Sequence, residues 1–489
     1  MLPGCSKASW ERLSTNRKGD HMPAQVVEVF PIGDTDNGWR NELFEFLNNR
    51  IDQILKKTHM EKIEDITGAV FRSKSEILGQ FVLGFIKKQH GHLLDQEYCK
   101  CPKCNKNLKA WNKKAKRTVE SLGGRLNLYR PYFYCKDCNH GFYPLDEALG
   151  LAPSPKQYDI QDLEAWLSSE LPFKTAAEAF KRCTGDSLSA DHMFETANRI
   201  GNHLDILDVC PSKEEIEQKI DELSKGKFRR PVMMLAVDGA HTPTRPEPSP
   251  WKGKRGKGEY KEVKGFRLYL IDSDRIVHLI SWHQVQDEEQ FARGLLKIRE
   301  AGLIPQDKVR LSIIGDGAPW IWKKPLEIFP KAKQVLDFYH CSENIHEVAN
   351  AQYGKGTPQA KEWVEATFTR LFHNHIDDVI RGLKIMQPVS AEAKEQIDIV
   401  IRYLSKRKDK VNYGSVKRAG YHLGSGAIES ANKFISHVRL KRSGAWWYIS
   451  NANNILKLRC AKYNGTYEDI VRKYIEEDRK KSYVDSSIE

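Results

Sequence analysis

Two apolar runs that each lead into an aspartate constrain the fold of this 489-residue chain more than any other feature. Residues 232–237 lead into Asp238, and residues 309–314 lead toward Asp316. Each run predicts a buried strand that ends at its aspartate. Strands of an α/β sheet bring the side chains at their carboxyl ends to one edge. A third carboxylate, Glu429, opens an alanine-rich stretch that predicts a helix. Together the three carboxylates are suited to two divalent ions, Mg²⁺ or Mn²⁺, because these ions prefer oxygen ligands.

The segments around the two aspartates predict the rest of this domain. Strands are expected at residues 264–271, 276–282 and 334–339, and a helix is expected to begin at Asp287, where Gln290 completes a capping box. The resulting order β-β-β-α-β-α-β is that of an RNase H-like α/β core. A mostly helical stretch separates the last strand from Glu429, so the core is expected to be split by an all-α insertion. The expected bounds are 229–340 and 421–465 for the core, 341–420 for the insertion and 466–489 for a C-terminal tail.

The cysteines predict a second kind of metal site. Five of the ten cysteines fall between Cys99 and Cys138, and this clustering is typical of metal binding rather than of disulfides. Two CxxC pairs can hold one tetrahedral Zn²⁺ ion. Residues 125–134 alternate like a strand that leads into the second pair, so residues 96–145 predict a zinc ribbon. Cys99 is an alternative ligand beside the first pair. The four expected ligands are Cys101, Cys104, Cys135 and Cys138.

Charge favours a polyanionic partner. The net charge is +13 and the pI is about 9.0. Residues 99–138 contain eleven Lys and Arg residues but only two acidic residues. A ribbon that contacts DNA needs this excess of positive charge, whereas a purely structural ribbon does not. The alternative is a structural zinc clip with a solvated basic face. Two further basic segments predict contact with double-stranded DNA, although such runs are often only solvated loops. Their residues are Lys252, Lys254, Arg255 and Lys257, and then Lys433, Arg439, Lys441 and Arg442.

Helical periodicity predicts the remaining parts of this multidomain α+β chain. Residues 23–95 form one helical region, and residues 146–228 form another. In the second region, helices at 176–183 and 190–200 have the spacing of a helix-turn-helix, although an αα-hairpin that serves only packing looks the same. The chain lacks an apolar run long enough to span a bilayer and a signal-peptide core. We therefore expect a cytoplasmic, DNA-associated protein without membrane contact, and Met22 is an alternative start.

A set of motifs resembles a known family across residues 99–462. The motifs are RPYFYCKDCNHGFYPLDEALGL, VDGAH, GDGAPWIW, DFYH at residues 337–340, GSGAIESANKF, LKRSGAWW and NANNILKLRC. Together they resemble DDE transposases of bacterial insertion sequences, of the ISKra type in the Mutator-related group. This resemblance implies Asp238, Asp316 and Glu429 as the metal-binding triad of an RNase H-like core. His340 falls where Mutator-like proteins place a histidine, and those relatives often have cysteine at the position of Asp337.

The implied activity is divalent-metal-dependent cleavage and strand transfer at the terminal inverted repeats of an insertion sequence. Its partners would be element-end DNA, target DNA and a second copy of the chain, in a homodimer or larger assembly. Two alternatives remain open. One is a non-catalytic DNA-binding protein derived from a transposase, and the other is an RNase H-like nuclease without a strand-transfer step.

Overall fold

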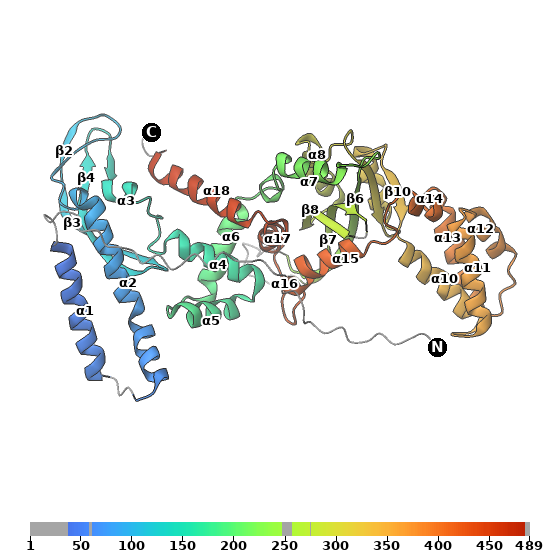
Figure 1. The fold of residues 1–489 in the computed structure, drawn as a ribbon, viewed down its shortest axis with the longest axis horizontal. Coiled ribbons are helices and arrows are strands. Elements are labelled where there is room, and N and C mark those ends of the chain that lie inside the picture. Colours follow the sequence, from blue (N-terminus) through green and yellow to red (C-terminus); the bar gives the residue numbers. More distant parts are fainter. Residues whose placement is uncertain (1–37, 58–60, 247–256, 274, 485–489) are drawn as a thin grey trace.

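The computed structural model describes residues 38–57, 61–246, 257–273 and 275–484. It shows a multidomain α+β protein in which the parts follow one another along the long axis (Figure 1). An N-terminal helical hairpin with a small sheet lies at one end, a group of helices follows, and a five-stranded sheet and a helical bundle lie at the other end. Within the described ranges, no helix has the length and apolar character needed to cross a membrane.

The N-terminal part is a helical hairpin packed on a small antiparallel sheet. Helix α1 (Gly38–Lys57) runs beside α2 (Ile63–Leu94), and α2 packs on strand β4 (Gly124–Cys135). A methyl group at Gly79 would lie 2.2 Å from the carbonyl oxygen of Arg125, so the glycine permits the close approach of α2 to β4. The observed β4 confirms the strand predicted at residues 125–134. The other strands are β1 (Tyr98–Lys100), β2 (Asn107–Lys109), β3 (Asn112–Ser121) and β5 (His140–Phe142).

The next part is helical, as predicted, and includes the C-terminal segment of the chain. Its helices are α3 (Pro144–Ala148), α4 (Tyr158–Glu170), α5 (Phe173–Thr184), α6 (Ala190–Asn202) and α7 (Lys213–Ser224). Helix α17 (Ile449–Asn464) packs against α4 and α6. Helix α18 (Tyr467–Arg479) returns to α4, where the Tyr158 hydroxyl donates to Asp478 at 2.8 Å. The segment expected to be a C-terminal tail is therefore mostly a packed helix.

The five-stranded sheet has the predicted order of elements. Along the chain these are β6 (Val232–Thr244), β7 (Glu259–Asp272), β8 (Arg275–Val285), α8 (Glu288–Glu300), β9 (Arg310–Gly315), α9 (Pro319–Ile328) and β10 (Lys333–Leu336). In space the strands lie in the order β10-β9-β6-β7-β8. The pairs β6–β7 and β7–β8 are antiparallel, whereas β9 is parallel to both β6 and β10. The predicted capping box at Asp287 and Gln290 is also observed at the start of α8.

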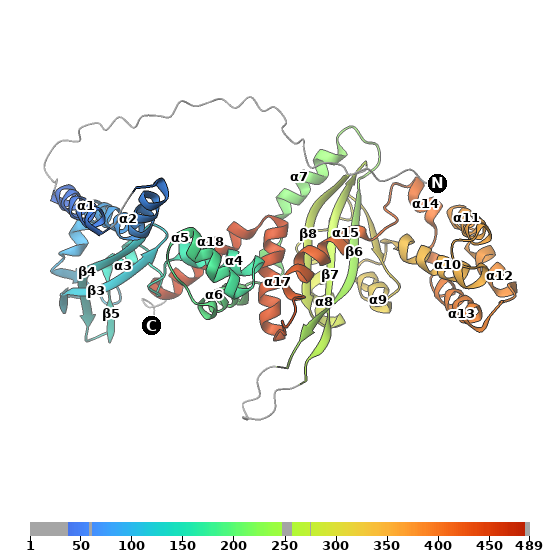
Figure 2. The same cartoon turned by 90° about the horizontal axis from the view of Figure 1, so that it is seen from below.

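Two predicted strand ends are wrong. Strand β6 does not stop at Asp238, because its antiparallel pairing with β7 continues as far as Thr244 and Glu259. In Figure 2 this β6–β7 hairpin extends beyond the rest of the sheet. The last strand stops at Leu336 rather than at Tyr339, because the side chain of Asp337 caps the next helix by accepting the backbone N–H of His340 at 2.7 Å.

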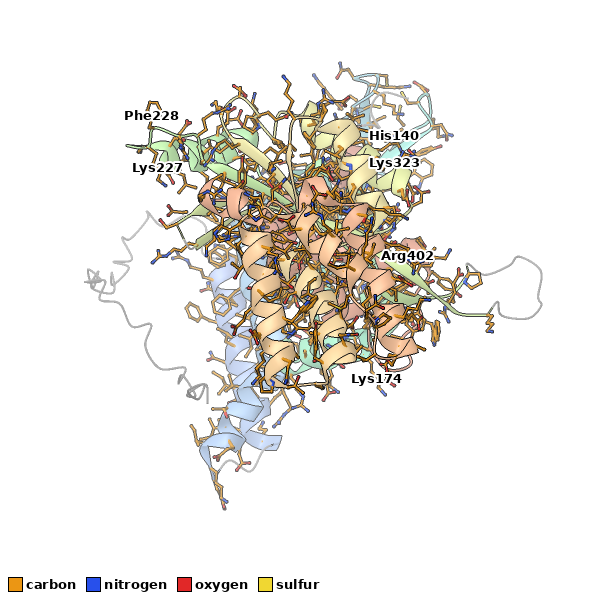
Figure 3. The ribbon with its side chains drawn as sticks, turned by 90° about the vertical axis from the view of Figure 1, so that its right-hand side faces the viewer. His140, Lys174, Lys227, Phe228, Lys323 and Arg402 are labelled. Atoms are coloured by element: carbon orange, nitrogen blue, oxygen red, sulfur yellow. The ribbon has the colours of Figure 1, made fainter. Side chains whose placement is uncertain are left out.

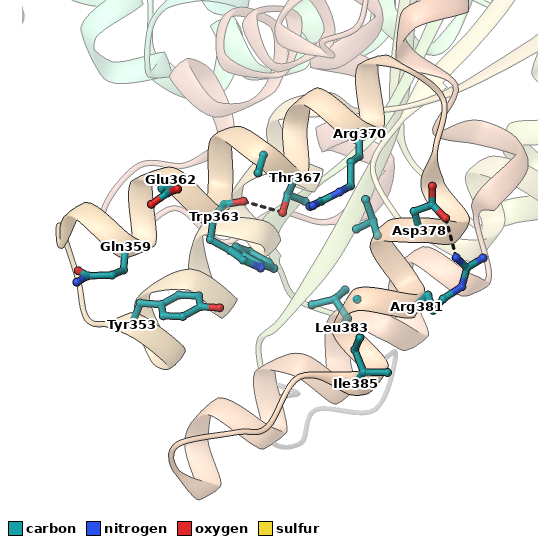
Figure 4. Close-up of a pocket in the computed structure, with 13 residues that line it drawn as sticks. Tyr353, Gln359, Glu362, Trp363, Thr367, Arg370, Asp378, Arg381, Leu383 and Ile385 are labelled. Atoms are coloured by element: carbon teal, nitrogen blue, oxygen red, sulfur yellow. Dashed lines mark hydrogen bonds and ion pairs between the residues drawn. The ribbon is translucent and has the colours of Figure 1, made fainter.

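An all-α bundle interrupts the sheet domain, as predicted. Its helices are α10 (Phe338–Tyr353), α11 (Pro358–Phe372), α12 (Ile376–Ile385), α13 (Ala391–Ser405) and α14 (Tyr413–Arg418). A pocket of about 560 Å³ opens between α11 and α12, lined in part by Trp363 and Arg370 (Figure 4). After the bundle, α15 (Gly426–Asn432), a π-helical turn (Lys433–His437) and α16 (Val438–Leu440) bring the chain back to the sheet.

Candidate active site

Three aspartates lie side by side just beyond the point where the parallel pairing of β6, β9 and β10 ends. The last parallel pair of β6 and β9 joins Ala236 to Ile314, so Asp238 and Asp316 both lie two residues beyond it. The last pair of β10 and β9 joins Leu336 to Gly315, which places Asp337 opposite Asp316. The backbone N–H of Asp337 donates to the carbonyl oxygen of Gly315 at 2.9 Å. The parallel register therefore sets all three carboxylates at one edge of the sheet.

Asp238 is held firmly, and its surroundings disfavour its charge. Its Oδ1 accepts the backbone N–H of Gly239 at 2.8 Å, and its Oδ2 accepts the side-chain amide of Asn432 at 2.7 Å. Burial raises the pKa of Asp238 to about 6, and the charges of Asp316 and Glu429 add to this effect. A carboxylate in these surroundings is stabilised by a bound cation, because a cation offsets both burial and like-charge repulsion.

Asp316 and Asp337 are oriented by the loops that follow their strands. The Oδ1 of Asp316 accepts the backbone N–H of Ala318 at 2.8 Å, at the start of α9. The buried carboxylate of Asp337 accepts Nδ1 of His340 at 3.1 Å and the backbone N–H of Ser425. Burial acts to raise the pKa of Asp337, but the hydrogen bonds from His340 and Ser425 outweigh it and lower this pKa.

His340 is a half-exposed histidine that carries a positive charge at neutral pH. The hydrogen bond to Asp337 raises the pKa of His340 to about 9, against the opposing effect of partial burial. Asp316 contributes in the same direction through its charge. The charge of His340 also acts on Asp238, so the histidine predicted as an accessory residue lies within the electrostatic reach of all three aspartates.

Glu429 reaches the same edge from the helix after the insertion. It lies in the first turn of α15, is exposed, and accepts the hydroxyl of Ser425 at 3.0 Å. One ligand atom each from Asp337, His340 and Glu429 lies within 4.8 Å of the others, so these three groups can hold a metal ion once His340 has lost its proton. The structure thus brings Glu429, Asp238 and Asp316 to one region, although the tightest group contains Asp337 and His340.

Two residues of this site have no role in the sequence prediction. Asp337 sits in a segment that looks like strand, but it repeats the pattern of an apolar run followed by an aspartate, and this signal points to the sheet edge. Asn432 lies one helical turn after Glu429, so both side chains fall on the same face of α15. That spacing is the only sequence signal for Asn432.

The four cysteines form a second site that can bind a metal. One Sγ atom from each of Cys101, Cys104, Cys135 and Cys138 lies within 4.8 Å of the others. The Sγ atoms of Cys101 and Cys138 are 3.9 Å apart, and those of Cys104 and Cys135 are 3.7 Å apart. Thiolates about 2.3 Å from a tetrahedral zinc ion lie roughly 3.8 Å from one another, so the spacing fits Zn²⁺.

The thiol pKa of Cys101 supports metal binding, and the position of Cys99 shows which thiols belong to the site. Burial acts to raise the pKa of the Cys101 thiol, but hydrogen bonds from the backbone of Cys104 and Lys103 lower it to about 7. Cys99, the alternative ligand, is outside the group of four, and its Sγ points to the carbonyl oxygen of Lys100 at 3.5 Å.

The predicted DNA-contacting residues divide into three groups. Lys257, Lys433, Lys441 and Arg442 are exposed. Lys252, Lys254 and Arg255 lie outside the described residues. Arg439 is buried, and its Nε donates to the carbonyl oxygen of Ser168 at 2.9 Å. The prediction that Arg439 contacts DNA is therefore corrected, because its guanidinium is enclosed between the rings of Phe173 and Trp447.

The two helices of the expected helix-turn-helix are present as α5 and α6. Helix α6 buries Met193, Ala197 and Ile200 and packs against α4 and α17. A methyl group at Gly201 would lie 2.6 Å from the carbonyl oxygen of Asn454 on α17. This close packing favours the alternative in which the helix pair serves as a packing element.

Comparison with known proteins finds a similarity that covers part of this region. Residues 251–477 match the sequence model of an uncharacterised protein family, UPF0236. The match includes α15 with Glu429 and the strand end with Asp316, but not Asp238 or the cysteine site. The chain is also similar to the UPF0236 protein in vanSb 3'region of Streptococcus gallolyticus. The two are 22% identical over 364 residues, which cover 72% of this chain and 74% of that protein.

Proposed function

We propose that this protein is a DNA transposase that cuts the terminal inverted repeats of an insertion sequence and joins the cut ends to target DNA. The observation that supports the proposal best is the placement of Asp238, Asp316 and Glu429 at one edge of a sheet with strand order β10-β9-β6-β7-β8. In chain order this is 5-4-1-2-3, consistent with an RNase H-like core. Asp316 and Glu429 help to raise the pKa of Asp238, and such a group of like charges is costly as structure alone, which favours a cation-dependent role.

The residues present fit divalent cations. Asp238, Asp316 and Glu429 would hold Mg²⁺ or Mn²⁺, since their donors are carboxylate oxygens and Glu429 is exposed to an incoming substrate. Such ions, if bound there, would supply Lewis acidity for an attacking water or 3′ hydroxyl and for the leaving oxygen. The chain's own contribution is orientation. Gly239 and Asn432 fix the carboxylate of Asp238, and Ala318 fixes that of Asp316, so the oxygens of these two aspartates need no rearrangement when substrate binds.

His340 gives the site a positive charge of its own. Its raised pKa keeps the imidazole protonated at neutral pH, and its side chain is 43% exposed. A protonated imidazole beside the carboxylates can donate a charge-assisted hydrogen bond to a phosphate oxygen. Asp337 orients the ring, because the carboxylate accepts from Nδ1 and leaves Nε2 for the substrate.

Double-stranded DNA would lie along the exposed basic residues. Lys257, Lys433, Lys441 and Arg442 are exposed, and the last three follow Glu429 within fourteen residues. The cysteine site would hold one structural Zn²⁺ ion in a segment rich in lysine, which adds phosphate contacts that do not depend on sequence. In the cell the protein would be cytoplasmic and associated with DNA.

The test uses labelled DNA that carries the flanking repeat ends, a target plasmid, and Mg²⁺ or Mn²⁺. Wild-type protein is expected to cut the ends and to produce joined products, and Asp316→Asn is expected to bind the same DNA without cutting it. Cleavage without joining would instead indicate a nuclease. A zinc-loaded wild type that binds the repeats but never cuts them would indicate a non-catalytic DNA-binding protein and would overturn the proposal.

A further inference from the structure

The N-terminal hairpin of α1 and α2 exposes an unusual number of large apolar side chains. On α2, six of them follow a helical stripe: Ile63, Ile66, Val70, Leu78, Phe81 and Phe85. Neighbours in the stripe are three or four residues apart, both from Ile63 to Val70 and from Leu78 to Phe85. Lys74 interrupts the stripe between these two parts, and its ammonium lies over the Phe71 ring. Three more are on α1: Phe44, Ile51 and Leu55. We call these nine residues the hairpin face.

The hairpin face lies on the outer side of the two helices. Helix α2 turns Val82, Leu83 and Ile86 toward the core that it shares with β3 and β4. Because a helix turns about 100° per residue, Phe81 and Phe85 point well away from that core. Their neighbours on α1 adjoin them, since the rings of Trp39 and Phe85 are 6.2 Å apart. Figure 2 shows the hairpin on one side of β3 and β4. The end of α5 contacts α2 beside the stripe, where Lys74 donates to the carbonyl oxygen of Cys183 at 3.4 Å.

The exposed area is large enough for a stable interface. Ile63 is 66% exposed and Phe44 is 62% exposed, and the other seven lie between 38% and 60%. Aromatic side chains have about 150–250 Å² of surface and aliphatic ones on the order of 100–150 Å², so the hairpin face exposes roughly 550–850 Å². The largest apolar patch of a typical monomer covers about 300–600 Å². One side of a stable protein–protein interface covers about 800 Å².

The charges at the ends of α2 complement a second copy in antiparallel orientation. The first turn carries Glu64 and Asp65, and the last two turns carry Lys88 and His92, all exposed. A two-fold axis across the hairpin would set the acidic end of one α2 beside the basic end of the other. A two-fold interface uses the same surface on both subunits, so one stripe can bury itself against its own copy.

We propose that the hairpin face is a dimerisation surface, on which two copies of this chain pack α1 and α2 into an antiparallel four-helix arrangement. The interface would bury the nine apolar side chains and pair the charged ends of α2. This inference does not rest on the proposed function, since it uses only the hairpin and its charges.

The first experiment measures the mass of the full-length, zinc-loaded protein by light scattering over a micromolar dilution series. Wild type is expected to be a dimer, and the double variant Val70→Glu with Phe81→Glu is expected to be a monomer. The matched control is Phe228→Glu, because Phe228 is a fully exposed aromatic residue far from the hairpin (Figure 3), and this variant should dimerise normally. Circular dichroism and zinc content establish that each variant is folded.

A charge-reversal series tests the orientation without adding charge to the apolar stripe. Glu64→Lys with Asp65→Lys is expected to weaken the dimer about tenfold at low salt, and adding Lys88→Glu with His92→Glu is expected to restore it. A monomeric wild type overturns the proposal, as does a dimer that the Val70→Glu, Phe81→Glu variant preserves. A wild-type monomer that dimerises only after removal of residues 1–37 also overturns it, because the chain's own segment would then occupy the face.

Discussion

The side-chain amide of Asn432 donates to Oδ2 of Asp238 at 2.7 Å and so connects the helix that carries Glu429 to the central strand of the sheet. The two residues are separated by the whole all-α insertion, and Asn432 is buried. Behind Asn432 lies His283, whose complete burial lowers its pKa to about 3 and keeps it neutral. Asn432 is thus a positioning residue, since it fixes one oxygen of Asp238 and the place of α15 together.

If the protein cuts DNA as proposed, replacing Asn432 with alanine should slow the cleavage without abolishing DNA binding. The hydrogen bond to a carboxylate contributes about 1.5–3 kcal/mol, so we expect cleavage to fall roughly tenfold to a hundredfold. The loss should be accompanied by a higher Mg²⁺ concentration for half-maximal rate, because Asp238 is then less well oriented. Cleavage kinetics at a series of Mg²⁺ concentrations measures both effects. The control is Ser430→Ala on the same helix, which should change neither, and equal effects of both variants would contradict the assigned role.

The buried carboxylate of Asp238 predicts a pH dependence of stability. Its pKa is raised to about 6 from 3.8, so the folded state binds its proton more tightly than the unfolded state does. The stabilising effect of protonation is therefore present below the unfolded pKa and is lost as pH rises through about 6. With EDTA present, wild type should lose about 2 kcal/mol of stability between roughly pH 4 and pH 7 through this group.

The Asp238→Asn variant should not show this loss of stability between pH 4 and pH 7, because an amide does not titrate. Thermal unfolding in EDTA across this pH range measures the difference between the two proteins. Adding Mg²⁺ at neutral pH should raise the melting temperature of wild type more than that of the variant. Parallel pH profiles for the two proteins would show that Asp238 is not the titrating group.

The local sequence pattern predicted the strands of the sheet well but only some residues of the candidate active site. Apolar runs located β6 and β9, and Asp238 and Asp316 are in register because both lie beyond those runs. The role of Asp337 was missed although an apolar run precedes this aspartate, because Phe338 and Tyr339 favour a longer strand and the cap on His340 ends β10. The burial of Arg439 could not be predicted from the local sequence either. Its burial depends on Phe173 and Trp447, and Phe173 is more than 260 residues away in the chain.

If the cysteine site holds zinc as proposed, serine variants should distinguish the group of four cysteines from Cys99. Cys135→Ser is then expected to bind no Zn²⁺ and to destabilise the part of the chain around β4, because Cys135 is the last residue of that strand and is fully buried. Cys99→Ser is expected to retain one Zn²⁺ ion per chain, since its Sγ lies outside the group of four. Elemental analysis of the purified proteins measures the metal content. Loss of zinc from Cys99→Ser would place a different set of thiols at the site.

Arg439 is buried and Lys441 is exposed, so replacing Arg439 should reduce stability whereas replacing Lys441 should affect only DNA binding. Arg439→Ala removes a hydrogen bond to Ser168 and the contacts of a guanidinium with two aromatic rings, so the free energy of unfolding should fall by about 2–4 kcal/mol. Lys441→Ala removes only an exposed charge and should change stability by less than about 0.5 kcal/mol. If Lys441 contacts a phosphate, its loss should reduce the salt dependence of DNA binding by about one unit of slope. Denaturant unfolding and binding titrations over a range of salt concentrations measure these effects. A stable Arg439→Ala protein with weakened DNA binding would restore Arg439 to the DNA surface.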